Sequence, residues 1–279
     1  MINETIDLYK YYGRDRNGTN GGYLTVYART ESKEVKKRIR PAVLVIPGGA
    51  YTGVSDREGE PVALKYLDAS FVSFVLSYSV KTKYPVPLNE AMLTMKYIRD
   101  NAEKYNIDKD RVCAIGFSAG GHLCGLLATT TDEEAARINV RAKDIKPNAV
   151  VLSYPVVTMG EYGHGDSRFN ITGGDTSLYE KLSVEKRVNN NSAPAFIWHT
   201  YEDTCVPMEN SLLLTSAYRK CGVPISLHIF EHGGHGLSLA NDEVCDDGIY
   251  GLYAENANKW FELSLDWLKA RNICMEKVR

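Results

Sequence analysis

A serine surrounded by glycines is the first residue of this sequence whose setting suggests chemistry. Ser118 lies in the stretch GFSAG (116–120), between an apolar run at 111–117 and a run of small and apolar residues. The pattern G-x-S-x-G between a strand and a helix is typical of a sharp turn that exposes a nucleophilic hydroxyl. A nucleotide-binding turn would carry G-x-G-x-x-G or end in G-K-[ST], and this turn has neither. The segment therefore predicts a nucleophilic serine.

A base and a residue that orients it should follow, because a serine hydroxyl needs a positioned base to take its proton. In this kind of architecture the order along the chain is Ser, Asp, His, each on a loop after a later strand. The loop WHTYEDTCVP holds Glu202 and Asp203, and FEHGGHGLSLA holds His232 and His235. His235 lies between two glycines that free its backbone, and Asp203 precedes TCVP, whose proline opens the next helix. We predict Ser118, Asp203 and His235 as catalytic, with Glu202 at solvent and His232 at the surface or in a supporting position.

The remaining histidines have structural interpretations, on a helix, on strands or in a polar segment: His122, His164, His199 and His228. A zinc site at His228, His232 and His235 is disfavoured, because neither HExxH spacing nor cysteine ligands accompany them. No metal and no cofactor are predicted.

A glycine-containing loop, VIPGGAY (45–51), follows an early strand and predicts donors for a developing oxyanion. Lipases and esterases carry an HGGG-type loop at this place. The backbone N–H groups of Gly49 and Ala50, together with that of Ala119, are the predicted donors. A simple glycine turn is the alternative. Tyr51, the next residue, is predicted to contact the substrate.

Strands and helices alternate along the chain. Runs typical of strands lie at 23–29, 42–46, 71–78, 111–117, 149–157, 195–200 and 225–230. Helices are expected from Ser55, where Glu58 gives capping-box spacing, and at 88–102, 119–130, 208–220 and 255–270. The alternation predicts an α/β protein with a mainly parallel central sheet, an antiparallel early strand and helices on both faces. Ligands of such sheets bind beyond the carboxyl ends of the strands.

One domain over residues 1–279 is predicted, because no repeat or linker divides the chain. The segment 159–192, rich in Gly, Asn and charge, is either a small cap over the site or a surface excursion.

Composition narrows the partners. A net charge of −2 gives no electrostatic reason to expect nucleic acid or a membrane surface. The start of the chain lacks the apolar core of a signal peptide, and no run is long enough to span a bilayer. We therefore expect a cytoplasmic protein with six reduced cysteines and a small-molecule or oligosaccharide ester as its substrate.

Four motifs together resemble one family. IPGGAY, GFSAGGHL, WHTYEDTCVPMENS and EHGGHGLSLA are similar, in order, to those of α/β-hydrolase serine esterases of the carbohydrate (xylan) acetylesterase-like branch. The resemblance implies an α/β-hydrolase fold and hydrolysis of short acyl esters, often acetyl groups on sugars. It also implies Ser118 as nucleophile, Asp203 as acid and His235 as base. Pro47 replaces the histidine of the hormone-sensitive-lipase-like branch, and Ala50 replaces the third glycine.

Other functions use the same motifs. An arylformamidase or a small peptidase would need the same catalytic residues. A non-catalytic binding protein of this fold is disfavoured, because such proteins typically lack a member of the triad and none is missing here. The polar character of 159–192 favours short acyl groups over long ones, because each buried methylene contributes about 0.8 kcal/mol and needs an apolar surface.

Overall fold

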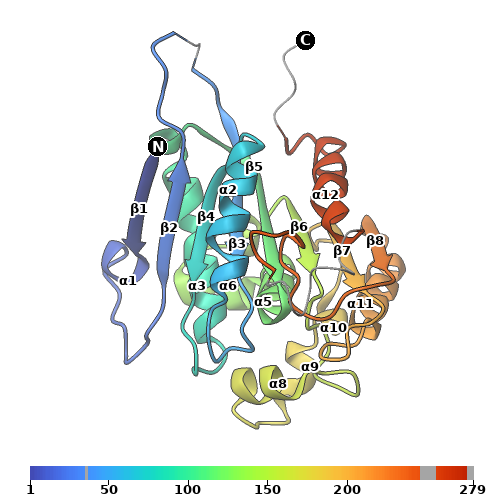
Figure 1. The fold of residues 1–279 in the computed structure, drawn as a ribbon. Helices are drawn as coiled ribbons and strands as arrows, with labels where there is room; N and C mark the ends of the chain where they lie inside the picture. Colours follow the sequence, from blue (N-terminus) through green and yellow to red (C-terminus); the bar gives the residue numbers. More distant parts are fainter. Residues whose placement is uncertain (35–36, 246–255, 275–279) are drawn as a thin grey trace.

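A mixed β-sheet forms the centre of the molecule (Figure 1). The structure is a computed structural model that describes residues 1–34, 37–245 and 256–274. Within these residues the sheet has eight strands in the order β1-β2-β4-β3-β5-β6-β7-β8. The strands are β1 Ile2–Asp7, β2 Tyr23–Ala28, β3 Arg40–Ile46, β4 Val72–Ser77, β5 Ile107–Phe117, β6 Ala149–Ser153, β7 Ala195–Thr200 and β8 Ile225–Phe230.

Strand direction divides the sheet into two parts. β1 pairs with β2, and β2 with β4, in antiparallel fashion. The six strands from β3 to β8 pair in parallel, in the order β4-β3-β5-β6-β7-β8. The parallel strands all end at one edge of the sheet, which we call the carboxyl edge, and begin at the opposite, amino edge. The predicted α/β class, with a mainly parallel sheet and an antiparallel early strand, is confirmed.

Helices cover both faces of the sheet (Figure 1). The longer ones are α2 Glu60–Asp68, α3 Val86–Asp100, α5 Ser118–Ala128, α8 Gly165–Thr172, α11 Glu209–Lys220 and α12 Trp260–Lys269. Short α-helices are α1 Leu8–Tyr11, α4 Ala102–Tyr105, α6 Asp132–Ala135, α7 Ala142–Ile145, α9 Leu178–Leu182 and α10 Val184–Arg187. Single 3-10 turns lie at η1 Asp56–Glu58, η2 Ala136–Ile138 and η3 Ala257–Lys259.

Two apolar cores result from the alternation of side chains along each strand. On β3, Leu44 and Ile46 belong to one core, and Val43 and Val45 belong to the other. The first core contains residues of α3, α5 and α11, and the second contains residues of α2 and α12. Each fully buried aliphatic or aromatic side chain contributes about 1.5–3 kcal/mol.

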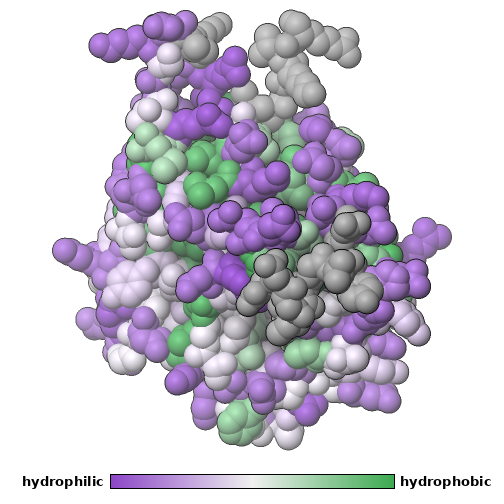
Figure 2. All heavy atoms as spheres, viewed as in Figure 1, coloured by the Kyte–Doolittle hydropathy of each residue, from purple (hydrophilic) through white to green (hydrophobic). Residues whose placement is uncertain are grey.

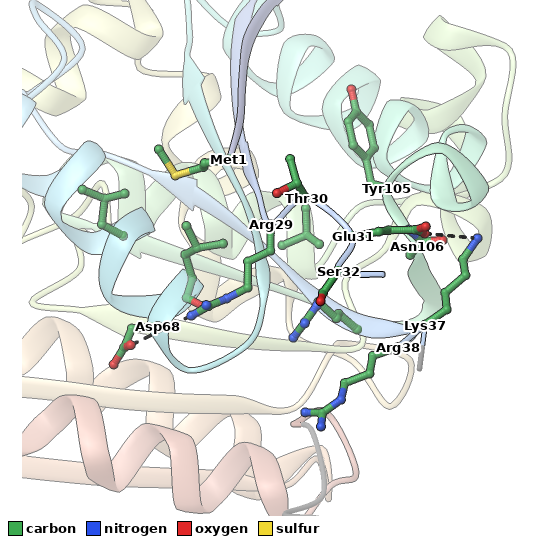
Figure 3. Close-up of a pocket in the computed structure, with 14 residues that line it drawn as sticks. Met1, Arg29, Thr30, Glu31, Ser32, Lys37, Arg38, Asp68, Tyr105 and Asn106 are labelled. Atoms are coloured by element: carbon green, nitrogen blue, oxygen red, sulfur yellow. Dashed lines mark hydrogen bonds and ion pairs between the residues drawn. The ribbon is translucent and has the colours of Figure 1, made fainter. Parts of the chain in front are cut away.

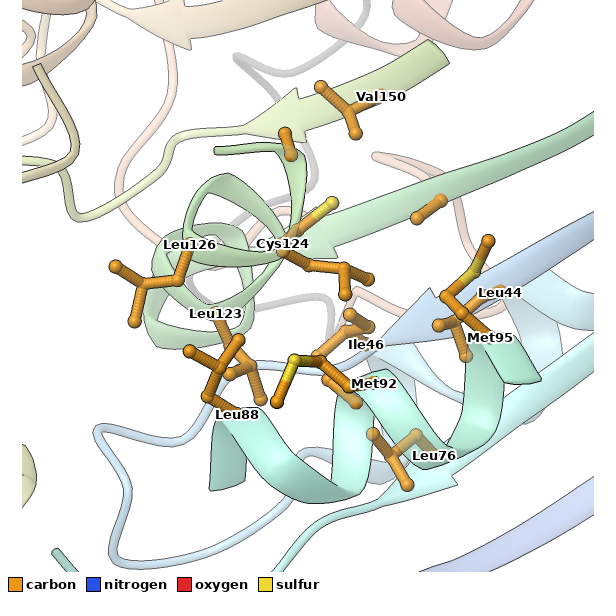
Figure 4. Close-up of a cluster of buried hydrophobic side chains, with 14 of the residues drawn as sticks. Leu44, Ile46, Leu76, Leu88, Met92, Met95, Leu123, Cys124, Leu126 and Val150 are labelled. Carbon is orange, nitrogen blue, oxygen red and sulfur yellow. The ribbon is translucent and has the colours of Figure 1, made fainter. Parts of the chain in front are cut away.

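Figure 4 shows part of the first core, where α3 and α5 lie over the central strands. Leu88, Met92 and Leu123 gather near Ile46 of β3, and Leu44 lies beside Met95 further along α3. All of these side chains are buried. All residues of α5 are buried, so Ser118 at its start is held in place relative to the sheet. On the face seen in Figure 2, by contrast, hydrophilic residues predominate and apolar ones lie between them in small groups.

Three local expectations were wrong or incomplete. The capping box of Ser55 and Glu58 does not form: the Ser55 side chain caps nothing, and α2 begins only at Glu60. The strand predicted at 149–157 ends at Ser153, because Tyr154 takes a left-handed φ of +36°. β1 was not predicted, since its alternation is short and only partly buried.

The segment 159–192 forms α8, α9 and α10, and Figure 1 shows α8 and α9 at the lower end of the molecule. It is anchored to the core: Val184 N–H donates to Val157 O at 2.9 Å, and Val184 is 1 % exposed. Arg187 forms a buried ion pair with Glu134 at 2.6 Å. A helix was predicted at 255–270, and its first residue lies outside the described residues. Among those described, no helix has both the length and the apolar character needed to cross a membrane.

Candidate active site

Ser118 lies at the junction of β5 and α5, on a backbone bend. Its φ is +52°, a left-handed conformation that is rare for a residue other than glycine. The two glycines of the motif are required by packing rather than by flexibility. A Cβ at Gly116 would lie 2.3 Å from Gly120 O, and a Cβ at Gly120 would lie 2.1 Å from Ile46 O. Strand and helix therefore close tightly behind the serine and hold its hydroxyl at the carboxyl edge.

The structure brings Ser118, His235 and Asp203 together. His235 Nε2 lies 2.7 Å from Ser118 Oγ, and His235 Nδ1 lies 2.7 Å from Asp203 Oδ2. The Asp203 side chain is fully buried and that of His235 is 20 % exposed. A neutral imidazole in this position donates its Nδ1–H to the carboxylate and presents Nε2 to the serine proton. These residues come from loops after β5, β7 and β8, which all end at the same edge.

Asp203 is held by more partners than the sequence suggested. Its Oδ1 accepts the N–H groups of Cys205 at 3.0 Å and Val206 at 2.9 Å. His199, interpreted only as a strand residue, lies with Nε2 3.2 Å from Asp203 Oδ2. Burial raises the pKa of Asp203, but the hydrogen bonds with His199 and His235 outweigh it and hold that pKa well below its usual value. The carboxylate therefore stays ionised throughout the neutral range.

His199 itself is fixed by three contacts. Its Nε2 also lies 2.8 Å from Val206 O, and its Nδ1 lies 2.8 Å from Ser211 Oγ on α11. In the sequence, only the short spacing of four residues between His199 and Asp203 hinted at this contact. That spacing does not predict a contact unless the conformation of the loop is known.

The loop after β3 has three successive left-handed residues. Gly49 has a φ of +125°, Ala50 of +53° and Tyr51 of +59°. Asn170 of α8 donates to Ala50 O at 2.9 Å, so the segment 159–192 contacts this loop. Within the described part of the chain, no hydrogen bond occupies the N–H groups of Gly49, Ala50 or Ala119. The N–H of Ala119 is one of those that a helix start leaves without a partner.

Tyr51 does not offer a surface to a substrate, so that expectation was wrong. Its side chain is fully buried, and its hydroxyl lies 2.7 Å from His122 Nδ1. The left-handed backbone turns the ring inward, where Tyr78 packs against it at 5.7 Å. His122 Nε2 in turn donates to Leu182 O at 2.7 Å. Burial lowers the pKa of His122 to about 4, so this ring is neutral and joins the loop to α9.

Glu58 is a further residue that the sequence placed wrongly. The residue is 3 % exposed, and its carboxyl accepts hydrogen bonds from the N–H of Gly48 at 2.7 Å and from the hydroxyl of Tyr154 at 2.7 Å. The capping-box spacing drew attention to Glu58 but assigned it to its own helix.

Glu202 and His232 lie at the surface and do not take part in the hydrogen bonds among Ser118, His235 and Asp203. The carboxylate and the imidazole are 3.0 Å apart, with side chains 48 % and 45 % exposed. Glu202 also accepts the N–H of Gly233 at 2.9 Å. This exposed pair braces the loop that carries His235. In the described residues, no three His, Cys, Asp or Glu side chains are grouped in a way that could hold a metal ion.

Three hollows bordered by described residues lie away from Ser118. One of about 740 Å³ is lined by Arg29, Arg38 and Asp68, beside the starts of β3 and β4 (Figure 3). Two others border Asn148 and Pro194, which precede β6 and β7. These three hollows lie at the amino edge, opposite Ser118.

The fold together with the geometry at its carboxyl edge defines an α/β-hydrolase. Residues 26–218 match the BD-FAE family model, and the chain belongs to that family. It is 40% identical over 82% of its length to endo-1,4-beta-xylanase B of Butyrivibrio fibrisolvens. It is 30% identical over 71% of its length to the acetylxylan esterase of Xylanibacter ruminicola. The chain spans only 37% and 41% of these two relatives.

Solved structures show the same architecture over nearly the whole chain. The acetyl ester-xyloside bifunctional hydrolase of Caldicellulosiruptor lactoaceticus superposes with a TM-score of 0.84 at 34% identity, covering 98% of this chain and 97% of that one. A carboxylesterase of Lactobacillus plantarum also gives 0.84, at 28% identity, covering 99% of this chain and 100% of that one.

Proposed function

We propose that this chain is a serine ester hydrolase that removes short acyl groups, acetyl foremost, from a small or carbohydrate substrate. The observation that carries the proposal is the continuous hydrogen-bonded set from Ser118 Oγ through His235 to Asp203, each link 2.7 Å long. A nucleophile, a base and an ionised orienting group in contact are what acyl transfer through a serine requires.

The first half-reaction uses the residues in the following roles. Ser118 Oγ attacks the ester carbonyl carbon while its proton passes to His235 Nε2. The oxygen of the tetrahedral intermediate takes the negative charge and accepts hydrogen bonds from the N–H groups of Gly49, Ala50 and Ala119. When the intermediate collapses, the alcohol leaves with the proton from His235, and the acyl group remains on Ser118.

Water completes the reaction. His235 takes a proton from water, whose oxygen attacks the acyl carbon, and Ser118 Oγ leaves with that proton as the free acid forms. Asp203 holds the imidazole in the orientation both halves need and stabilises its charged form without itself taking a proton.

Two observations support short acyl groups and a sugar leaving group. Four tyrosines could have formed an aromatic groove for a long chain: Tyr51, Tyr78, Tyr84 and Tyr154. Three of them are at most 1 % exposed, and Tyr84 is partly buried with its hydroxyl donating to Glu134 at 2.9 Å. Relatives of this chain include an acetylxylan esterase and an acetyl ester-xyloside hydrolase.

The test begins with labelling and ends with substrates. A fluorophosphonate probe should modify the protein at Ser118, and the Ser118→Ala variant should stay unlabelled. Among nitrophenyl esters, kcat/KM should fall from acetate through butyrate to octanoate, and acetylated xylo-oligosaccharides should release acetate. An unlabelled wild type would favour a binding protein. An octanoate optimum would defeat the short-acyl proposal, and faster turnover of formylarylamines or peptides than of any ester would replace it.

A further inference from the structure

Glu58 is a buried carboxyl that the proposed mechanism leaves without a role. It lies in η1, ten residues after Gly48 in the chain, and is 3 % exposed. Burying a carboxyl is costly unless its oxygens are hydrogen-bonded. Both are: Oε2 accepts from Gly48 N–H at 2.7 Å and Oε1 accepts from the Tyr154 hydroxyl at 2.7 Å.

The direction of these hydrogen bonds favours the ionised form of Glu58. Tyr154 Oη accepts the N–H of Ser238 at 2.8 Å, and its single proton is donated to Glu58. Both carboxyl oxygens therefore act as acceptors, which suits a carboxylate. Burial raises the pKa of Glu58 above its usual value, and the hydrogen bonds from Tyr154 and Gly48 reduce that rise without cancelling it.

One end of this contact set is the loop that holds the oxyanion donors. Gly48 directly precedes Gly49 and packs against both the nucleophile and the carboxylate. A Cβ at Gly48 would lie 2.9 Å from Ser118 Cβ and 2.8 Å from Glu58 Oε2. The N–H of Gly48 is taken by Glu58, and the two loop residues predicted to donate to the oxyanion, Gly49 and Ala50, follow directly.

The other end is the loop that holds the base. Ser238 follows His235 by three residues, and its hydroxyl donates to Arg57 O at 2.6 Å, next to Glu58. The Tyr154 ring packs edge-on against the His235 ring at 5.1 Å. One short segment, Arg57 and Glu58, thus binds to both loops.

We propose that Glu58 is a positioning residue that holds the oxyanion loop and the His235 loop as one unit, through Gly48 on one side and Tyr154 with Ser238 on the other. The inference rests on the proposed function. A carboxylate between the two loops sets the distance from the oxyanion donors to the base, and acyl transfer is sensitive to misplacement on the order of 1 Å. Glu58 acts through these groups and does not touch the reacting atoms.

The test compares Glu58→Gln and Tyr154→Phe with wild type on nitrophenyl acetate. Glu58→Gln keeps the shape but only one acceptor oxygen, and Tyr154→Phe keeps the ring against His235 but removes the bridging hydroxyl. Each should lower kcat by about 10- to 100-fold, less than or comparable to the loss of an oxyanion donor, with KM within about threefold. Asp56→Asn is the matched control, because it removes an exposed carboxylate two residues away, and its kcat should match wild type.

A double-mutant cycle tests whether the two groups act as one unit. Glu58→Gln combined with Tyr154→Phe should lose no more than the worse single variant, because the second change breaks contacts that are already lost. Thermal melts of all variants report the folded fraction, and if Glu58→Gln does not fold, Tyr154→Phe alone carries the test. If wild type hydrolyses nitrophenyl acetate, three results would overturn this inference alone: an unchanged kcat in the variants, a change in KM without a change in kcat, or losses that add in the double variant. A wild type without activity would overturn the proposed function and this inference with it.

Discussion

The two edges of the sheet differ in how they place polar groups. At the carboxyl edge, Asp203 and Glu58 are buried and hydrogen-bonded on every side. At the amino edge, Arg29 and Asp68 face each other across 4.0 Å with side chains 46 % and 88 % exposed. Three hollows bordered by described residues lie at the amino edge. The carboxyl edge buries polar groups and satisfies them with hydrogen bonds, without which their burial would be costly.

Backbone conformation shows the same contrast. Left-handed residues at the carboxyl edge include Ala50, Tyr51 and Ser118, for which this conformation is unfavourable. At the amino edge Asn106, before β5, takes it at little cost because asparagine tolerates this region, and Ser70, before β4, takes it as well. More of the unfavourable left-handed residues therefore lie where the chemistry is proposed, and surrounding contacts must hold them there.

The largest expected effect of breaking the carboxyl edge is that of Ser118→Ala. Removing the hydroxyl leaves nothing to form the acyl intermediate, so kcat for nitrophenyl acetate should fall by up to about 10⁶-fold. The circular dichroism spectrum should stay that of wild type, because the change removes one oxygen at a position that is already held by packing. A variant that keeps a tenth of the wild-type rate would exclude Ser118 from the mechanism.

Next in size are the partners of the serine. Asp203→Asn should lower kcat by about 10⁴-fold, because an amide does not favour the required imidazole tautomer, and His235→Ala should be at least as severe. The exposed pair supplies matched controls: Glu202→Gln and His232→Ala should keep activity within about tenfold, since solvent-exposed pairs of this kind hold little energy. A dead His232→Ala variant beside an active His235→Ala variant would reverse the assignment of the base.

The buried His122 should make the free energy of unfolding depend on pH. His122 has a pKa of about 4 when folded and 6.5 in its ordinary state, so the unfolded chain binds more protons between these values. Stability that is present above pH 6.5 should therefore be lost as the pH falls toward 4, at up to about 1.4 kcal/mol per pH unit. Urea unfolding at pH 7, 6 and 5 measures this slope.

Two variants test whether His122 causes this dependence of the free energy of unfolding on pH. His122→Gln should flatten it, because glutamine does not titrate. His232→Gln should not, because His232 is exposed and its pKa is raised by Glu202, which makes its contribution opposite in sign. Equal slopes in wild type and His122→Gln would mean that other groups control acid stability.

The smallest effect is expected at the amino edge. Asp68→Asn removes the exposed ion pair with Arg29 and should change the free energy of unfolding by less than about 1 kcal/mol, with kcat/KM unchanged. Chemical denaturation and the acetate assay check both. A marked loss of activity would show that this edge takes part in function and would end the contrast between the edges.

Local patterns in the sequence were sufficient for most of the fold. The runs 195–200 and 225–230 became β7 and β8 with the predicted bounds. β7 is a central strand that is buried throughout, as a short apolar run allows, whereas β8 is the edge strand and is only partly buried. The glycine spacing around Ser118 predicted its bend, since the packing of strand on helix excludes side chains at these positions.

The order of the polar loops predicted which residues meet at Ser118, but it did not identify the groups that support them. His199 and Glu58 lay in segments with ordinary structural explanations, and Tyr51 was expected to face the substrate. Tyr51 and Glu58 contact residues far apart in the chain, as Glu58 and Tyr154 are, 96 positions from each other. His199 contacts Asp203 only four positions away, but the contact depends on how the loop after β7 folds.

The sequence by itself thus determined the order of the strands and longer helices after β1, apart from α8, the bend at Ser118 and the order of the loops that carry Asp203 and His235, because each depends on neighbours within a few positions. Only the tertiary structure decided that Tyr51 turns inward to His122, that His199 holds Asp203 and that Glu58 joins two loops. A buried polar group takes whichever partner the fold brings within about 3 Å, and that partner is set by the packing of whole elements and not by local spacing.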